Sequence, residues 1–230
     1  MPIALITGAS RGLGRAAAHA LARRGWSLIV DARRADDLAA AMRGLADVVT
    51  VPGDVTDPGH RASLAAAAGR AGALDVLVNN ASRLGPSPQP PLRDYPLDEL
   101  GRVYETDVFA PLALIQLLAA PLAAAAGTIV NVSSDAAVEA YPGWGGYGSA
   151  KAALDQLTAV LAAEEPSLRC YALDPGDMRT DMHQQAFPGE DISDRPEPDT
   201  VVPALLRLIG ERPPSGRYRA SDLAVPAVTP

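Results

Sequence analysis

The chain has 230 residues, a net charge of −7 and one cysteine, and it is 48% hydrophobic and 20% charged. The acidic balance argues against nucleic acid or an anionic membrane as a partner, because both favour an excess of Lys and Arg. The apolar content excludes a disordered chain. No basic start followed by an apolar run occurs, nor does any uninterrupted apolar run of about 18 residues. We therefore expect a cytoplasmic protein with a single domain over residues 1–230.

Short apolar runs alternate with longer segments rich in Ala and Leu. The short runs lack regular alternation, which is typical of strands covered on both faces. This order of elements predicts an α/β fold, a doubly wound parallel sheet with helices on both faces. The predicted strands are 3–7, 27–31, 47–51, 75–79, 128–132, 169–173 and, more weakly, 216–220. The predicted helices lie near 12–24, 35–45, 58–71, 97–122, 147–164 and 199–210.

Two long segments, 83–96 and 181–198, interrupt this alternation, and each follows a predicted strand. Ligands of open α/β sheets bind beyond the carboxyl ends of the strands. We expect both segments to be substrate-binding loops, with disordered surface loops as the alternative. No cluster of His and Cys suggests a metal site.

The segment TGASRGLG, Thr7–Gly14, follows the first predicted strand and opens the first predicted helix. Its glycines allow a close backbone approach, and a helix N-terminus offers N–H donors and a positive dipole to a phosphate. A simple tight turn is the alternative. The position between a strand and a helix favours nucleotide binding.

Six motifs occur together and in one order: TGASRGLG (7–14), GDVTD (53–57), NNAS (79–82), NVSS (131–134), YGSAK (147–151) and PGDMRTDM (175–182). In this order and at these spacings the chain resembles the short-chain dehydrogenase/reductase family over nearly its whole length. The resemblance implies a Rossmann-like sheet of seven strands and an NAD(P)-dependent oxidoreductase of the carbonyl reductase type, acting on the CH–OH group of an alcohol or on a carbonyl.

The resemblance also implies the cofactor site. The residue that closes the second strand reads the adenosine ribose, and we place Ala32 there with Arg33 after it. An arginine pair, Arg33 with Arg11, can bind a phosphate, so we expect NADP(H) rather than NAD(H). A register shifted by one residue would make Asp31 an NAD-type acid. The implied cofactor-binding residues are Gly8, Ser10, Arg11, Gly12, Leu13, Gly14, Arg33, Arg34, Asp54, Val55, Asn80, Ala81, Tyr147, Lys151, Pro175, Gly176, Met178 and Thr180. Asp54 could instead be a turn residue, and Thr180 could also cap a short helix.

The pair Tyr147 and Lys151 predicts acid/base chemistry. Hydride transfer to a carbonyl carbon leaves charge on oxygen, which must be held and protonated. A free tyrosine has a pKa of about 10, and a nearby ammonium lowers it. Lys151 lies one helical turn after Tyr147, although an exposed pair on an amphipathic helix would show the same spacing. Ser134 lies 13 residues before Tyr147, where its family counterpart binds the substrate oxygen.

Two residues depart from the family pattern. Asp107 occupies the position of a fourth catalytic residue, an asparagine in the family, and an ionised carboxyl there could partly cancel the effect of Lys151 on Tyr147. Asp107 could alternatively support a local helix irregularity. Ser82 replaces a usual glycine and brings a side chain close to the expected nicotinamide ribose.

The expected substrate is a small, mostly apolar ketone or aldehyde, or the corresponding alcohol, because the residues near the two loops are mostly apolar: Leu84, Tyr141, Trp144, Met182, His183 and Phe187. His183 could contact a substrate or only face solvent, and we expect it to face solvent. The family's fourth and fifth helices commonly pair across a dimer axis, and segments 111–127 and 152–165 have small apolar surfaces. The tail 221–230 lacks a glycine-rich ending, so a homodimer is favoured over a tetramer. A non-catalytic NADP-binding regulator or scaffold is the alternative to an enzyme.

Overall fold

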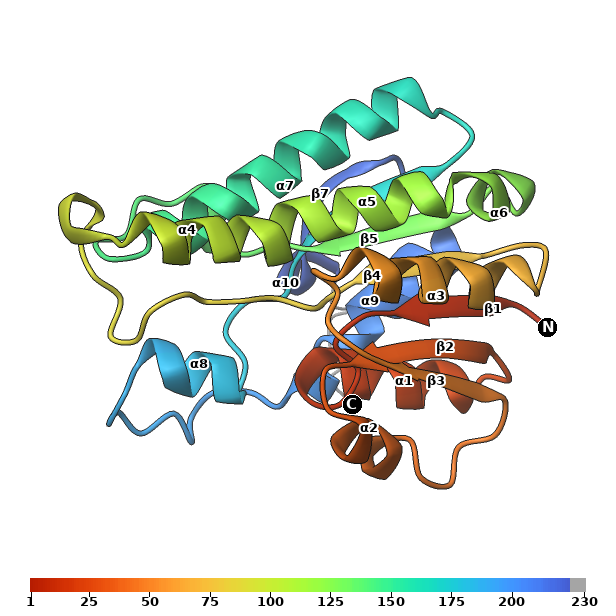
Figure 1. The fold of residues 1–230 in the computed structure, drawn as a ribbon, viewed down its shortest axis with the longest axis horizontal. Coiled ribbons are helices and arrows are strands. Elements are labelled where there is room, and N and C mark those ends of the chain that lie inside the picture. Colours follow the sequence, from red (N-terminus) through yellow and green to blue (C-terminus); the bar gives the residue numbers. More distant parts are fainter. Residues whose placement is uncertain (224–230) are drawn as a thin grey trace, which may run out of the picture.

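A computed structural model describes residues 1–223 of the chain (Figure 1). Its seven strands form one parallel sheet in the order β3-β2-β1-β4-β5-β6-β7. The predicted doubly wound, Rossmann-like sheet is therefore confirmed. The strands are β1 Ile3–Ile6, β2 Ser27–Ala32, β3 Val48–Pro52, β4 Val76–Asn79, β5 Thr128–Val132, β6 Arg169–Asp174 and β7 Gly216–Arg219.

Helices cover both faces of the sheet. One apolar core joins the sheet to α1 and α9, and a second joins its opposite face to α3 and α5. Strand order reverses at β1, which lies between β2 and β4, so a ligand crevice is expected at the carboxyl ends of β1 and β4. The helices are α1 Gly12–Ala22, α2 Ala35–Ala41, α3 Pro58–Gly69, α4 Leu97–Tyr104, α5 Ala110–Leu117, α6 Ala119–Ala124, α7 Gly145–Glu164, α8 Asp181–Ala186, α9 Val202–Glu211 and α10 Ala220–Leu223.

The long helix predicted at 97–122 is wrong in detail. It divides into α4, a π-helical turn at Glu105–Phe109 that we call the π turn, and α5, with α6 following after Leu118. Pro111 at the start of α5 has no N–H to donate to the preceding turn, which favours a change in helical geometry there. Figure 1 shows α4, the π turn and α5 as one rod beside α7.

The segment 181–198 is not irregular throughout, because it begins with α8. Thr180 caps this helix, with its Oγ1 accepting from His183 N at 3.1 Å, as expected from the sequence. Figure 1 shows α8 and the segment before α4 projecting past the carboxyl ends of the strands. None of the helices within residues 1–223 combines the length and apolarity needed to span a bilayer. Most of the tail used to choose between dimer and tetramer, 224–230, lies outside the described residues.

Candidate active site

The glycine turn between β1 and α1 is locked against the end of β4. Asn80 Nδ2 donates to the carbonyl oxygens of Thr7 and Gly8 at 2.9 and 3.2 Å, and Thr7 Oγ1 accepts from Asn80 N at 3.0 Å. A Cβ on Gly14 would lie 2.5 Å from Asn80 Nδ2, so only glycine fits there. Gly8 has a φ of +67°, which glycine adopts without strain. The first turn of α1 has no side-chain cap, so its N–H groups remain available to an anion.

A cleft of about 1180 Å³ runs from the ends of β2 and β3, past the glycine turn, to α7 and α8. Its size suits a dinucleotide together with a small substrate. Three of the implied cofactor residues do not line it: Gly14, which packs under the turn, Arg34 and Gly176. Those that do are Gly8, Ser10, Arg11, Gly12, Leu13, Arg33, Asp54, Val55, Asn80, Ala81, Tyr147, Lys151, Pro175, Met178 and Thr180.

At one end of the cleft, β2 closes at Ala32, the register expected from the sequence. Asp31 is 1% exposed and bonded within the protein. Its Oδ1 accepts from Gly8 N at 2.7 Å, and His60 Nε2 lies 3.0 Å from its Oδ2. Burial raises the pKa of Asp31, and the hydrogen bonds from His60 and Gly8 offset part of that effect. This contact was not predictable from the sequence, because His60 lies on α3, 29 residues after Asp31.

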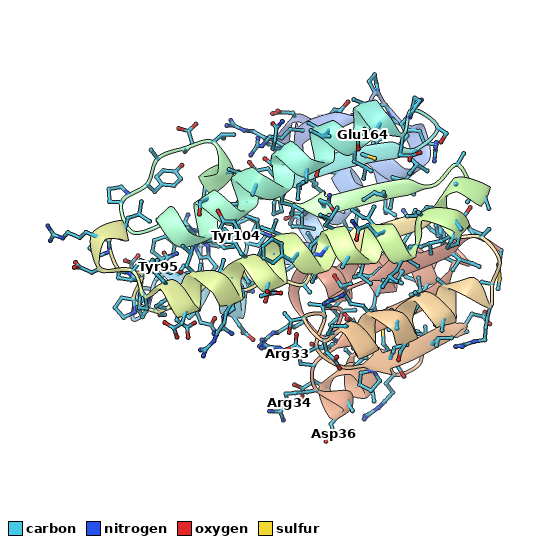
Figure 2. The ribbon with its side chains drawn as sticks, turned by 45° about the horizontal axis from the view of Figure 1, so that its top comes forward. Arg33, Arg34, Asp36, Tyr95, Tyr104 and Glu164 are labelled. Carbon is cyan, nitrogen blue, oxygen red and sulfur yellow. The ribbon has the colours of Figure 1, made fainter. Side chains whose placement is uncertain are left out.

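The two arginines after β2 differ in their surroundings. Arg33 lines the cleft and forms no ion pair within residues 1–223. Arg34 pairs with Asp37 of its own helix at 3.0 Å. Figure 2 shows both side chains projecting outward from the segment that precedes α2. Arg11, on the glycine turn, pairs with Asp181 of α8 at 2.6 Å. Asp54 Oδ1 accepts from Thr56 N at 2.9 Å, so this residue forms a turn as well as lining the cleft.

At the other end of the cleft, α7 carries Tyr147 and Lys151 on one buried face. Lys151 Nζ lies 5.4 Å from the centre of the Tyr147 ring and donates to Val132 O at 2.9 Å. An exposed Tyr–Lys pair is excluded, since both side chains are buried. The small residues around Tyr147 allow this close packing: a Cβ on Gly148 would lie 2.5 Å from Ala136 O. The helix is thereby held against the segment that follows β5.

Ser134 lies on that segment, where it caps the short 3₁₀ turn Asp135–Ala137. Its Oγ accepts from Ala136 N at 3.2 Å and donates to Asp135 Oδ1 at 3.0 Å. Ser134 does not line the main cleft, whereas its neighbour Ser133 does. Ser133 is buried, and its Oγ has no hydrogen-bond partner of good geometry within the described residues. Ser134 thus caps this turn through its Oγ, whereas Ser133 packs in the interior.

Asp107 lies in the π turn and is 0% exposed. Its Oδ1 is 3.5 Å from Lys151 Nζ, and its two carboxyl oxygens accept from Arg83 N at 3.2 and 3.3 Å. Asp107 thus lies in a helix irregularity and also contacts Lys151, the two features on which the alternative expectations for this residue depend. Burial raises the pKa of Asp107, and the Lys151 ammonium offsets part of this shift.

Burial also decides the acidity of the phenol. It raises the pKa of Tyr147, Lys151 lowers it in part, and Asp107 raises it further. For Lys151 burial alone would lower the pKa, but the charges of Asp107 and Tyr147 outweigh burial and raise it. The sequence predicted a Tyr147 pKa lowered by Lys151. The net direction of the Tyr147 pKa is upward, because burial of the phenol is the larger effect.

Aromatic side chains pack beside Tyr147 on the substrate side. Trp144 packs edge-on against Tyr147 with ring centres 5.9 Å apart, and Phe187 lies 5.9 Å from Trp144. Leu84 and Met182 line the cleft, whereas Trp144, His183 and Phe187 do not. Tyr141 does not line it either: its hydroxyl donates to Asp135 Oδ2 at 3.0 Å, and it lines a separate cavity of about 390 Å³. His183 was expected in solvent, but its side chain is only 11% exposed because it packs against Phe187.

Another residue that the sequence did not single out is Arg217 of β7. Its guanidinium donates to Asp155 Oδ2 and Asp174 Oδ2, each at 3.0 Å, and to Ser134 O at 2.9 Å. It thus joins α7, the end of β6 and the segment of Ser134. Residues 216–220 carry no motif that could have indicated this role.

Comparisons with known proteins agree with this geometry. The family model described as short chain dehydrogenase matches residues 2–191. Mouse sepiapterin reductase is 35% identical over 201 residues, covering 80% of this chain and 77% of its own. A 2-(R)-hydroxypropyl-CoM dehydrogenase of Xanthobacter autotrophicus is 34% identical over 202 residues, 84% of this chain and 81% of its own. An alcohol dehydrogenase of the archaeon Thermococcus sibiricus, solved in complex with 5-hydroxy-NADP, superposes with a TM-score of 0.84 at 28% identity, covering 95% of each chain.

The chain belongs to the short-chain dehydrogenase/reductase family. It is an NAD(P)-dependent oxidoreductase acting on CH–OH or carbonyl groups of small molecules, as its relatives are. Within residues 1–223 no group of three or more His, Cys, Asp or Glu side chains is arranged to hold a metal ion.

Proposed function

We propose that this chain is an NADP(H)-dependent reductase of small, mostly apolar carbonyl compounds, with Tyr147 as the acid/base. The observation that carries the proposal is the arrangement of one cleft. A buried Tyr147–Lys151 pair lies at one end, and the cation Arg33 lies at the other, with the bare glycine turn between them.

The residues present fit a dinucleotide. The closely packed glycines keep the backbone exposed for a pyrophosphate, and the uncapped start of α1 offers donors to it. Arg33 and Arg11 would hold an adenosine 2′-phosphate, and Lys151 would hold the nicotinamide ribose. When bound, the dinucleotide supplies or accepts the hydride at its nicotinamide ring.

In the direction of reduction, Tyr147 donates its phenolic proton to the carbonyl oxygen of the substrate. Ser134 supports this oxygen with a hydrogen bond. Its Oγ is already positioned by Ala136 N, so the hydroxyl hydrogen needs only to turn from Asp135 toward the substrate. Lys151 stabilises the phenolate left on Tyr147. In the oxidative direction the phenolate is the base.

The preference for NADP(H) is supported by the surroundings of Asp31. An NAD-type acid must offer its carboxylate to the ribose hydroxyls. Asp31 is instead buried and bonded to Gly8 N and His60, whereas Arg33 is exposed in the cleft. The ratio of kcat/KM for NADPH to that for NADH tests this preference, and a clear preference for NADH would refute it.

The substrate class is supported by Leu84 and Met182, which line the cleft beside Tyr147, and by Trp144, which packs against Tyr147 and against Phe187. For assembly we propose a homodimer through the rod of α4, the π turn and α5, together with α7. These elements leave the large apolar side chains of Leu97, Phe109, Leu117 and Val160 exposed. The single domain over residues 1–230 remains part of this proposal.

The decisive test is a screen of small ketones and aldehydes for NADPH oxidation, followed by Tyr147→Phe. We expect this variant to lose turnover by about 100-fold or more, because it removes the phenol that donates the proton in the proposed mechanism. Its NADPH affinity, measured by quenching of protein fluorescence, should change little. If Tyr147→Phe retained turnover, the assignment of Tyr147 as the acid/base would be refuted. NADPH binding without turnover of any substrate would favour the non-catalytic regulator or scaffold.

A further inference from the structure

The two residues that depart from the family pattern are neighbours in space. Ser82 directly precedes Arg83, whose backbone N–H donates to both carboxyl oxygens of Asp107. Asp107 contacts Lys151, and Lys151 lies beside Tyr147. Ser82 itself lines the cleft at this point. A hydroxyl that replaces a usual glycine therefore lies beside a carboxyl that replaces a usual carboxamide.

Ser82 lines the same cleft as Tyr147 and Lys151, and it directly precedes the residue whose N–H binds the Asp107 carboxyl. Its hydrogen bonding lowers the pKa of both the Tyr147 phenol and the Asp107 carboxyl. Its Oγ is nevertheless buried without a partner of full hydrogen-bond geometry among residues 1–223. A buried hydroxyl without a well-aligned partner carries a free-energy cost, so its presence calls for an explanation. One explanation is a hydrogen bond that forms when the charge of a neighbouring group changes during the reaction.

A serine hydroxyl has one proton to donate and two acceptor lone pairs. It cannot donate to Asp107 and to a Tyr147 phenolate at the same time. The ionised carboxylate is the stronger acceptor while Tyr147 holds its own proton. Once Tyr147 has given that proton to the substrate, the phenolate competes for the same donor.

We propose that Ser82 is a further member of the proton-transfer site, whose hydroxyl bridges the Tyr147 phenol and the Asp107 carboxyl and so links the acid/base to a buried charge. The inference rests on the proposed function of Tyr147. The link adds no covalent step, because Ser82 only turns its O–H between two acceptors. It gives this chain a connection from Tyr147 to Asp107 that does not pass through Lys151.

Other charges face the same groups and act alongside this link. Lys151 and Asp135 face Tyr147, and Asp155 faces Lys151. Removing Ser82 changes none of these charges. If replacing Ser82 changes the pH–rate profile by an amount that depends on the charge at Asp107, the hydroxyl bridge between Tyr147 and Asp107 is identified.

The test is a double-mutant cycle in the full chain with wild type, Ser82→Ala, Asp107→Asn and the double variant. The pH dependence of alcohol oxidation with NADP⁺ is measured for each, because Tyr147 is the base in that direction. Asp107→Asn should shift the rise in rate toward lower pH, and Ser82→Ala should shift it toward higher pH. With the carboxylate gone, Ser82 donates fully to the phenolate. Its removal should then lower kcat roughly ten-fold, and by less in wild type, since a hydrogen bond to a charged group is worth about 1.5–3 kcal/mol.

Two further variants keep the test decisive if Ser82→Ala is poorly folded. Ser82→Gly installs the usual family residue and should behave as Ser82→Ala does, whereas Ser82→Thr retains a hydroxyl and should restore wild-type behaviour. Ser133→Ala is the matched control. It also removes a buried hydroxyl without a well-aligned partner, but one near Asp155. Its effect should be the same with and without Asp107→Asn.

A second readout does not require turnover. Nuclear magnetic resonance of ¹³Cζ-labelled tyrosine, with the Tyr147 signal assigned from Tyr147→Phe, reports the phenol's titration in the cofactor-free protein. If Ser82→Ala shifts this titration equally in the wild-type and Asp107→Asn backgrounds, the link is refuted. If the shift caused by Ser82→Ala differs between the two backgrounds but wild type oxidises no alcohol, the proposed function fails while the link between Tyr147 and Asp107 through Ser82 holds.

Discussion

At the end of β2, the Asp31 carboxyl and the Arg33 guanidinium have different surroundings, and this difference bears on cofactor recognition. Asp31 is bonded to Gly8 N and His60, so it holds the glycine turn to α3. Offering it to a ribose would leave a buried N–H and a histidine without their acceptor, which is unfavourable. Arg33, two residues later, is exposed in the cleft. The proposed preference for NADP(H) therefore depends on Arg33 rather than on Asp31.

We expect Arg33→Ala to lower kcat/KM for NADPH roughly ten-fold, because a charge-assisted hydrogen bond to phosphate is worth about 1.5–3 kcal/mol. The value for NADH should change less than about two-fold, since NADH has no 2′-phosphate. Steady-state kinetics with both cofactors measure this difference. Arg34→Ala is the matched control, because Arg34 pairs with Asp37 outside the cleft. Equal losses in the two variants would contradict the assignment.

The raised pKa of Tyr147 sets the direction of the pH dependence. Reduction requires the protonated phenol, which predominates at every pH below its pKa. We expect the reductive rate to be nearly constant between about pH 6 and 9, and to fall only as the pH passes the Tyr147 pKa. The oxidative rate, which requires the phenolate, should rise with pH over the same range. A reductive rate that already falls near neutral pH would show that the phenol is more acidic than its burial implies.

At the scale of elements, β7 is coupled to the catalytic helix through one side chain. Arg217 bonds to Asp155 of α7, to Asp174 at the end of β6 and to the backbone of Ser134. Burial raises the pKa of Asp155, and the Ser133 hydroxyl and Arg217 counter that shift. A strand at the edge of the sheet therefore helps to hold both parts of the proton-transfer site.

We expect Arg217→Met to destabilise the protein by about 2–4 kcal/mol, because it leaves the largely buried Asp155 without its ion-pair partner and Asp174 with only the more distant Arg219, at 3.9 Å. Urea denaturation measures this change. In the folded variant kcat should fall while the KM for NADPH stays constant, since Ser134 loses its support and the distant cofactor end does not. Arg217→Lys should recover stability only in part, because an ammonium cannot donate in the fork geometry. Arg207→Met removes an exposed pair and serves as the control.

Elements that depend on local sequence are predictable here, and those that depend on distant partners are not. The strands follow from apolar runs, because a parallel sheet covered on both faces requires them. The π turn does not, since Asp107 is held by Arg83 and Lys151 from other segments. In the site, the motif residues around Tyr147 were predictable from spacing. Asp31–His60 and Arg217–Asp155 were not, because these partners lie 29 and 62 residues apart in the chain.

At the scale of the whole molecule, α8 connects the two ends of the cleft. On the cofactor side Asp181 pairs with Arg11 of the glycine turn at 2.6 Å. On the substrate side Gln185 O accepts from Ser87 Oγ at 2.6 Å, so the segments 83–96 and 181–198 are bonded to each other. Met182 of the same helix lies near Tyr147. A movement of the glycine turn can therefore be transmitted by α8 to the segment 83–96 on the substrate side.

We predict that the ion pair Arg11–Asp181 competes with the cofactor. Its side chains are 62% and 65% exposed, so the pair contributes little to stability, at most about 1 kcal/mol. The same guanidinium is one of two expected to bind a 2′-phosphate. We expect Asp181→Asn to tighten NADPH binding about two- to five-fold, the range of a surface ion pair. It should leave NADH binding and the melting temperature nearly unchanged.

Isothermal titration calorimetry with both cofactors distinguishes this competition from a change in net charge. Asp191→Asn alters the same charge in the same segment, but Asp191 bonds to Ser193 N rather than to Arg11, so it should not tighten NADPH binding. In an Arg11→Ala background the gain from Asp181→Asn should disappear, because the guanidinium for which carboxylate and phosphate compete is gone. A gain that persists without Arg11, or that Asp191→Asn reproduces, would mean that α8 affects the cofactor only through long-range charge.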